Sequence, residues 1–341
     1  MLSKNTEQMD STAGLQDEAT FQRVKQLNSD FSCQKINDRF GSQLHARITP
    51  SGKLKGSTIE ECAMTAKKLY HLSKDPIVLC LSSGADSQAL LQSFLLAKVP
   101  FRAAIMQFKN GFNEHDIRLA KQQCLELNIP HSIVDIDIIR FFESGTFIEY
   151  GKKYQCQSPQ LASHLWLFDQ VDGTPVASGN FYLPTMKDNH LFWFGMPGDL
   201  HGCLFRYFLE NDRPGEPWFF QNRSEVLRSF LSLPVLKSFS QRAESSFIDE
   251  YSIRCLAYQN AGFDIIPQEA KQTGFEVLRK HYDHQLGTKD GKGFDAIFRR
   301  PLEKLNPFVK NYTQIVPENI LPSTGQPIRF KSLYKKFQDF I

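Results

Sequence analysis

The chain of 341 residues is long enough for one large domain or two modest ones, and its 41% hydrophobic and 12% aromatic residues can bury a substantial core. A net charge of +3 neither requires nor excludes nucleic acid, and the basic residues near the end lack interleaved aromatics, so nucleic acid is not indicated. Seven singly scattered cysteines, no 18-residue apolar stretch and no signal-peptide pattern predict a soluble, cytoplasmic protein with no membrane partner.

The first half of the chain predicts alternating helices and strands after a polar, flexible extension over residues 1 to about 30. The expected elements are a helix over 59–70 that follows a capping pattern at Ser57, a strand over 77–81, a helix over 89–97, a strand over 101–108, a helix over 113–127, a strand over 131–138, a helix over 158–170 and a short strand over 175–177. This alternation predicts parallel strands joined by right-handed crossovers, with ligands bound beyond their carboxyl ends.

The second half of the chain predicts helices, over 224–233, 244–260 and 273–286. The stretch from Asn180 to Glu216, rich in Gly, Pro and aromatic residues, is expected to be a linker or an active-site cover. We therefore expect an N-terminal extension over 1–55, an α/β domain over 56–215 and a helical substrate or cover region over 216–341.

The junction between the strand over 77–81 and the following helix predicts an anion site. The intervening residues leave backbone N–H groups of the helix start unpaired above the end of the strand, and they are Ser82, Ser83, Gly84, Ala85, Asp86 and Ser87. An ordinary turn capped by Asp86 and Ser87 is the alternative. A Walker A loop is excluded, because the nearest approach, 287–292, has the wrong spacing and follows no apolar strand.

The order Ser-x-Gly-x-Asp-Ser after an apolar strand resembles the pyrophosphate loop of the N-type ATP pyrophosphatases, the superfamily of asparagine synthetase, GMP synthetase and NAD synthetase. The family's usual form is Ser-Gly-Gly-x-Asp-Ser, so Ser83 stands in place of the first glycine. The pattern is nearest to the synthetase domain of asparagine synthetase. The resemblance implies a Rossmann-like parallel sheet of four or five strands, of the type found in adenine nucleotide alpha hydrolases, with a helical C-terminal region.

The resemblance also implies which residues bind the nucleotide. Ser178 and Gly179 match a Ser-Gly turn that faces the nucleotide across from the pyrophosphate loop. Main chain near the end of the second strand reads the adenine edge in the family, which here indicates Gln107 and Phe108. Asp86 is the candidate ligand for magnesium, with capping of its own helix as the alternative. The acidic pair that follows the Ser-Gly turn in asparagine synthetase has no equivalent beside Asn180.

Cleavage of ATP between the α- and β-phosphates also requires a cation to stabilise the leaving pyrophosphate. The candidates are Lys271, Arg299 and Arg300, although for each of them alone the sequence favours a solvated surface position. His281 and His284 have metal-ligand spacing on a predicted helix, but no third ligand is near them in the sequence.

The sequence thus predicts an enzyme that uses ATP and Mg²⁺ to adenylate an acyl or carbonyl oxygen, with release of pyrophosphate, before a nitrogen nucleophile displaces AMP. The acceptor, a small molecule or a macromolecule, is not identified. The segment before the loop is too short for a glutaminase domain, so ammonia or an amine is expected to come free or from a separate donor. Sulfur transfer or sulfate-nucleotide reduction, with Cys156 or Cys203, and a catalytically inactive nucleotide-binding or structural protein are the alternatives.

Overall fold

The computed structural model describes residues 31–38, 41–48, 54–179, 184–187, 190–194, 198–220, 223–235, 250–268, 273–306 and 313–315. The extension expected over residues 1 to about 30 lies outside these ranges. None of the described helices combines the length and the apolar character that crossing a membrane requires.

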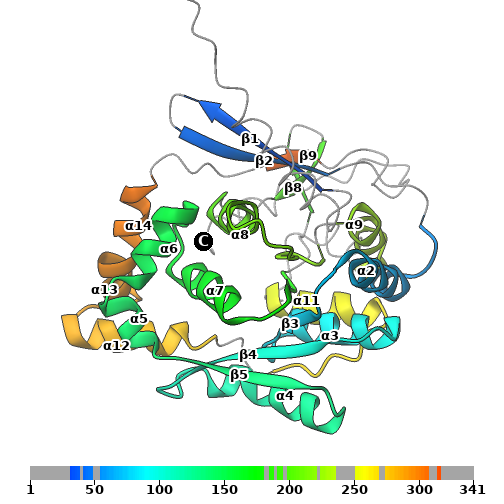
Figure 1. Ribbon diagram of the computed structural model, residues 1–341, viewed down its shortest axis with the longest axis horizontal. Coiled ribbons are helices and arrows are strands. Elements are labelled where there is room, and N and C mark those ends of the chain that lie inside the picture. Colours follow the sequence, from blue (N-terminus) through cyan, green and yellow to red (C-terminus); the bar gives the residue numbers. More distant parts are fainter. Residues whose placement is uncertain are drawn as a thin grey trace, which may run out of the picture.

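A four-stranded parallel sheet forms the centre of the fold (Figure 1). The strands are β3 (Ile77–Cys80), β4 (Arg102–Phe108), β5 (His131–Ile136) and β6 (Thr174–Ala177), in the spatial order β5-β4-β3-β6. All three pairings are parallel. The chain adds β4 and β5 on one side of β3 and then returns to add β6 on the other side. A parallel sheet with such a change of side has a crevice at the carboxyl ends of its strands, between β3 and β6. The predicted Rossmann-like α/β fold is confirmed.

Residues 215–220 extend the sheet beyond β6. The Glu216 N–H donates to Pro175 at 2.9 Å, the Ala177 N–H donates to Glu216 at 2.8 Å, and the Phe219 N–H donates to Ala177 at 3.1 Å. The boundary expected at residues 215–216 falls inside this paired segment. The segment carries Trp218 to the edge of the crevice.

One face of the sheet packs against α2 (Thr58–Leu72), α3 (Ala85–Ala97), α4 (Glu114–Glu126), α9 (Ser224–Leu231) and α11 (Glu250–Asn260). Leu79 and Ile105 from the strands share one buried cluster with Phe94 of α3 and Tyr258 of α11. The predicted capping pattern starts α2, where the Ser57 N–H donates to Glu60 Oε2 at 2.7 Å. Helices α9 and α11 thus belong to the same core as the α/β unit.

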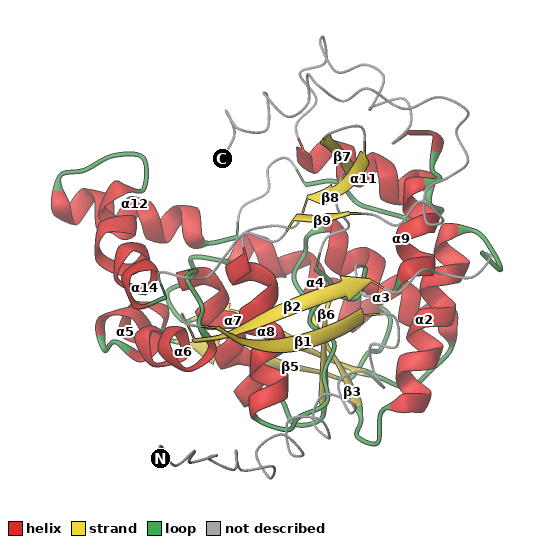
Figure 2. Cartoon of the chain, turned by 90° about the horizontal axis from the view of Figure 1, so that it is seen from above, coloured by secondary structure: helices red, strands yellow, loops and turns green. Residues whose placement is uncertain are grey.

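The other face of the sheet packs against α7 (Pro159–Gln170), because the alternate strand residues Val78 and Ala104 contact Leu167 and Val171. Beyond α7 lies a phenylalanine-rich core that includes Phe142 and Phe298. The helices around it are α5 (Ile138–Glu143), α6 (Thr146–Tyr154), α12 (Phe275–Leu286), α13 (Lys292–Phe294), the π-helical turn η1 (Asp295–Arg299) and α14 (Arg300–Leu305). Figures 1 and 2 both place α12 and α14 on the opposite side of the molecule from α2 and α3.

The stretch expected to be a linker or cover contains regular structure. It holds β7 (Pro184–Lys187), β8 (His190–Phe194) and α8 (Gly198–Glu210). Phe205 and Phe208 of α8 are buried against Leu165 and Phe168 of α7, so these aromatic residues form core rather than a cover. Two strands near the N-terminus, β1 (Phe31–Asp38) and β2 (Gly41–Ile48), pair antiparallel, and β9 (Thr313–Ile315) pairs with β8.

Candidate functional site

A cavity of about 400 Å³ lies at the carboxyl ends of β3, β4 and β6. The N-terminal ends of four helices reach its wall, through Gly84 before α3, Asn113 before α4, Ser158 before α7 and Thr273 before α12. Each helix start carries partial positive charge. This is the crevice that the strand order predicts, and its surroundings suit an anionic ligand.

The loop between β3 and α3 supplies hydrogen-bond donors to this cavity. Gly84 is the N-cap of α3 and has no side chain to cap it, so the N–H groups of Ala85, Asp86 and Ser87 have no partner in the described part of the chain. Beside them, the Ser82 and Ser87 hydroxyl oxygens lie 3.2 Å apart, and the Ser82 N–H donates to Ser87 Oγ at 3.1 Å. Three N–H groups and two hydroxyls therefore lie together at the start of α3, and such a set of donors suits an anion.

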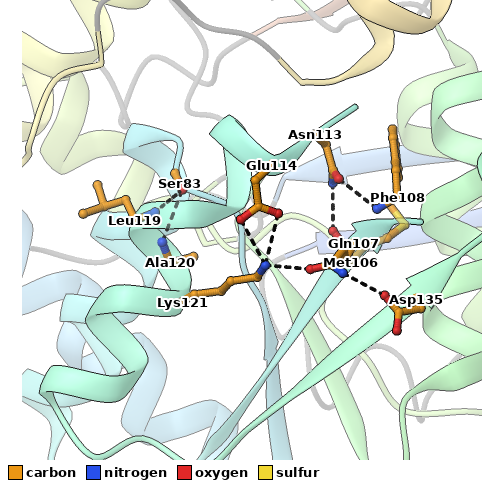
Figure 3. A network of polar contacts seen from close by, with 10 residues as sticks. All are labelled: Ser83, Met106, Gln107, Phe108, Asn113, Glu114, Leu119, Ala120, Lys121 and Asp135. Atoms are coloured by element: carbon orange, nitrogen blue, oxygen red, sulfur yellow. Dashed lines mark hydrogen bonds and ion pairs between the residues drawn. The ribbon is translucent and has the colours of Figure 1, made fainter. Parts of the chain in front are cut away.

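Ser83 and Ala85 face away from the cavity. Ser83 is fully buried, and its Oγ accepts hydrogen bonds from the N–H groups of Leu119 at 3.0 Å and Ala120 at 3.2 Å in α4 (Figure 3). The Ala85 methyl group lies in the core. The serine in place of the family's first glycine therefore fastens the loop to α4 without intruding on the phosphate space.

Gly84 adopts φ −65° and ψ 157°, an extended conformation open to any residue. A side chain at this position would therefore not strain the backbone. An added Cβ would meet only Ser82 Oγ, at 3.5 Å, so the protein has room for it. Any effect of a side chain at this position must come from the cavity that it enters.

Asp86 lies in the cavity wall but is held by α11. Tyr258 donates its hydroxyl to Asp86 Oδ1 at 2.7 Å, and Arg254 Nη1 forms an ion pair with Asp86 Oδ2 at 3.6 Å. Burial, followed by the charge of Asp86, raises the pKa of the Tyr258 hydroxyl well above its usual value, so the tyrosine stays a donor. Asp86 forms no capping hydrogen bond with its own helix.

Arg254 is the cation that sequence reasoning missed. It lines the cavity from α11, and its side chain is only 8% exposed. Its spacing of four from Tyr258 places the two residues on one face of a helix, which is the only signal the sequence offers. The spacing does not reveal that this face of α11 contacts Asp86, 168 residues earlier in the chain. Arg254 could therefore not be identified from the sequence.

The donor set around Asp86 does not fit a magnesium ion held by the protein. Both carboxylate oxygens already have partners, one of them cationic, and Mg²⁺ requires oxygen ligands in near-octahedral geometry. Across the described residues, no three His, Cys, Asp or Glu side chains are grouped so that they could hold a metal, and this includes His281 and His284. A metal that enters with a nucleotide would have to draw most of its ligands from phosphate and water.

At the end of β4 the main-chain groups are already paired. Asn113 accepts a hydrogen bond from the Phe108 N–H at 2.8 Å and donates to the Met106 carbonyl at 2.9 Å (Figure 3). Gln107 is turned outward, where it donates to Asp135 at 3.1 Å and accepts from Lys121 at 2.6 Å. Phe108 lines the cavity and Gln107 does not, so this strand end offers an apolar wall rather than main-chain donors and acceptors.

Ser178 and Gly179 line the same cavity across from the loop. Gly179 has φ +53°, and a Cβ there would lie 2.2 Å from Trp218 Cε3. The positive φ favours glycine, and the contact with Trp218 requires it. The structure thus brings together two motifs that lie almost 100 residues apart in the sequence.

Two of the three cations expected from the sequence lie away from the cavity. Arg299 is exposed and donates to Glu303 at 3.0 Å on the side of α14, and Arg300 is exposed at the start of the same helix. Neither lines the cavity. Lys271 lies outside the described residues, but of its described neighbours Gln268 donates to the Ser83 carbonyl at 3.1 Å and Thr273 lines the cavity.

Two further titratable groups line the cavity. Burial lowers the pKa of the His164 imidazole to about 4, so the ring is neutral at pH 7. Burial raises the pKa of the Cys80 thiol to about 12, so it is not a thiolate. Cys156 and Cys203, the candidates for sulfur chemistry, are buried, and Cys156 donates to the Ser158 carbonyl at 3.2 Å. A reactive cysteine is an accessible thiolate, whereas Cys80 is not a thiolate and Cys156 and Cys203 are buried.

No protein-family model matches the sequence, and a comparison with curated proteins finds no match. The fold is similar to three solved synthetases. The NH₃-dependent NAD synthetase of Campylobacter jejuni is 18% identical with a TM-score of 0.33, covering 63% of this chain and 97% of that one. The NMN synthetase of Francisella tularensis is 14% identical with a TM-score of 0.33, covering 76% and 97%. The glutamine-dependent NAD⁺ synthetase of Acinetobacter baumannii is 12% identical with a TM-score of 0.31, covering 79% and 49%. At these values the function has to be argued from the cavity.

Proposed function

We propose that this protein is an ATP-dependent adenylating enzyme of the ATP pyrophosphatase type. ATP would bind with its β- and γ-phosphates on the loop before α3, and an acyl or carbonyl oxygen of the acceptor would attack the α-phosphate and displace pyrophosphate. A nitrogen nucleophile would then displace AMP. The observation that carries the proposal is a set of two hydroxyls and three N–H groups, the latter without partners among the described residues, at the end of β3 beside a cavity faced by Ser178 and Gly179.

The electrostatics of the site fit the departure of pyrophosphate. Negative charge grows on the leaving group, and fixed donors inside a cavity stabilise it without reorganisation. The N–H groups of Ala85, Asp86 and Ser87 provide such donors, and Arg254 provides a nearby guanidinium. We keep Lys271 as a second proposed cation, because residues on either side of it touch the loop and the cavity. Arg299 and Arg300 are not proposed for this role.

The base of the nucleotide would use different contacts. Since Asn113 occupies the Met106 and Phe108 main chain, we propose that adenine packs on the Phe108 side of the cavity rather than pairing with the main chain there. The acceptor remains a small molecule or macromolecule of unknown identity, and a separate protein or free ammonia would supply the nitrogen. Sulfur transfer is not favoured, because Cys80, Cys156 and Cys203 are buried or held as thiols.

A nucleotide-binding protein without turnover is the second candidate. It is favoured by the engagement of both Asp86 oxygens, which removes the metal ligand that the sequence predicted. The two candidates share the phosphate site and differ only in whether ATP is cleaved.

The test is incubation of the protein with α-labelled ATP, magnesium and cell extract. The enzyme proposal predicts AMP and pyrophosphate in equal amounts, and Arg254→Met should lower their formation by about a hundredfold. Arg102→Met is the matched control, because Arg102 is 41% exposed and pairs with Asp172 away from the cavity. ATP binding without AMP formation in any extract would favour the binding protein, and ADP with phosphate would contradict both the enzyme class and the bond cleaved.

A further inference from the structure

We propose that Arg254 takes the place of a protein-held divalent cation beside Asp86, so that the cavity binds the phosphates of ATP and free pyrophosphate without a metal ion bound to the protein. This inference rests on the proposed nucleotide site and concerns how that site balances phosphate charge. It differs from the expectation that Asp86 is a magnesium ligand.

The position of Arg254 supports this role. The residue belongs to α11, whereas Asp86 belongs to the first turn of α3, and their charged groups meet at the cavity wall with 3.6 Å between Nη1 and Oδ2. Tyr258, one turn further along α11, fixes the other carboxylate oxygen at 2.7 Å. Two contacts from α11 therefore hold the first turn of α3, and they orient the Asp86 carboxylate toward the Arg254 guanidinium.

The chemistry of the guanidinium suits phosphate. A guanidinium is not deprotonated in proteins, so it stays positively charged, and its five N–H donors match the oxygens of a phosphate group. Its ion pair with Asp86 Oδ2, at 3.6 Å, places this guanidinium beside the loop at the cavity wall. Because the side chain is only 8% exposed, little water screens its charge.

A metal ion in the same place would be opposed by the residues present. It would share the Asp86 carboxylate with the Tyr258 hydroxyl, and it would lie next to the buried positive charge of Arg254. Among the described residues that line the cavity, the charged groups are Asp86, Asp116 and Arg254, and His164 is neutral at pH 7. Arg254 is thus the cation that this part of the chain directs at the loop.

The experiment measures binding of pyrophosphate and of a non-hydrolysable ATP analogue by calorimetry, once with EDTA and once with magnesium. We expect the native protein to bind both ligands in EDTA within about threefold of its affinity in magnesium. Arg254→Met should lose about tenfold or more in EDTA and recover part of that loss when magnesium is added. Arg102→Met, with an exposed arginine far from the cavity, should behave as the native protein does.

Asp86→Asn separates the two roles of the carboxylate, because the amide oxygen can still accept from Tyr258 while the charge is removed. If Asp86 only holds Arg254, the variant binds pyrophosphate in EDTA at least as tightly as the native protein does. Loss of binding in Asp86→Asn, or native binding that appears only with magnesium, would overturn the inference and leave the nucleotide site in place. Absence of binding under both conditions would overturn the nucleotide site as well. Should Arg254→Met fail to fold, Arg254→Lys and Asp86→Asn decide the outcome.

Discussion

The ends of β3 and β4 lie side by side at one cavity, and they differ in whether the backbone polar groups that follow them have hydrogen-bond partners. After β3, the N–H groups of Ala85, Asp86 and Ser87 have no partner among the described residues. After β4, Asn113 pairs with both the Phe108 N–H and the Met106 carbonyl. The open end can bind an anion, whereas the closed end presents a side-chain wall.

The difference comes from the residue at each N-cap. Gly84 cannot cap α3 with a side chain, so the helix start keeps its free donors. Asn113 is the N-cap of α4, but its amide turns to the neighbouring strand instead of its own helix. The glycine N-cap thus leaves donors that suit an anion, whereas the asparagine N-cap fastens its helix to a strand.

The largest expected effect is closure of the open end by Gly84→Val. The side chain would enter the cavity without straining the backbone, since φ is −65°. We expect a folded protein with ATP affinity lowered by about a hundredfold or more, measured by calorimetry. Gly179→Val is the contrasting variant, because its Cβ would strike Trp218, and it should lower the melting temperature as well. Native ATP affinity in folded Gly84→Val would contradict the phosphate site.

Removal of the Asn113 side chain, which pairs with the main chain at the end of β4, should have the next largest effect. Asn113→Ala leaves the Phe108 N–H and the Met106 carbonyl without their partner, and Asn113 is only 3% exposed. We expect a loss of about 2 kcal/mol in the free energy of unfolding, measured by urea denaturation. Asn260→Ala, which removes an exposed bond to the Leu256 carbonyl on α11, should cost no more than about 0.5 kcal/mol. Equal losses in the two variants would show that the closed end is not held by Asn113.

The two neighbouring serines of the loop sharpen the comparison. Ser83→Ala removes an acceptor for two N–H groups of α4, so it should lower the free energy of unfolding by about 1 kcal/mol and leave ATP affinity nearly unchanged. Ser87→Ala removes a hydroxyl at the cavity, so it should lower ATP affinity by about tenfold. If Ser83→Ala lowered ATP affinity and Ser87→Ala lowered only stability, the Ser83 hydroxyl would face the ligand and the Ser87 hydroxyl would not, which would contradict this account.

The smallest expected effect is a pH dependence from His164 in the cavity wall. Burial lowers the pKa of its imidazole from 6.5 to about 4, so the unfolded chain takes up the proton more readily than the folded protein does. The corresponding stability is complete above pH 6.5 and is lost as the pH falls toward 4, by about 1 kcal/mol over the first unit. His164→Gln should lack this component when urea denaturation of both proteins is compared across that range. Parallel curves for the two proteins would contradict a buried neutral imidazole.

The sequence predicted the parts of the site that local patterns encode. The apolar strand, the loop over 82–87 and the Ser178–Gly179 turn could all be found, because each depends on a few adjacent residues. Arg254 could not be found, because its role depends on how α11 packs against α3. The direction of the Ser83 hydroxyl and the pairing of the β4 main chain likewise depend on the docking of α4. Arg299 and Arg300 were candidates because they are cations in the C-terminal helical region, but an ion pair with Glu303 holds Arg299 at the surface.

Amide hydrogen exchange at the two strand ends tests the central claim most directly. The account predicts that pyrophosphate or ATP slows exchange of the Ala85, Asp86 and Ser87 amides, because the phosphate oxygens accept their hydrogen bonds. The Phe108 amide, already bonded to Asn113 at 2.8 Å, should exchange at the same rate with and without ligand. Binding of ATP that leaves the three loop amides unchanged would place the phosphates elsewhere and contradict the account.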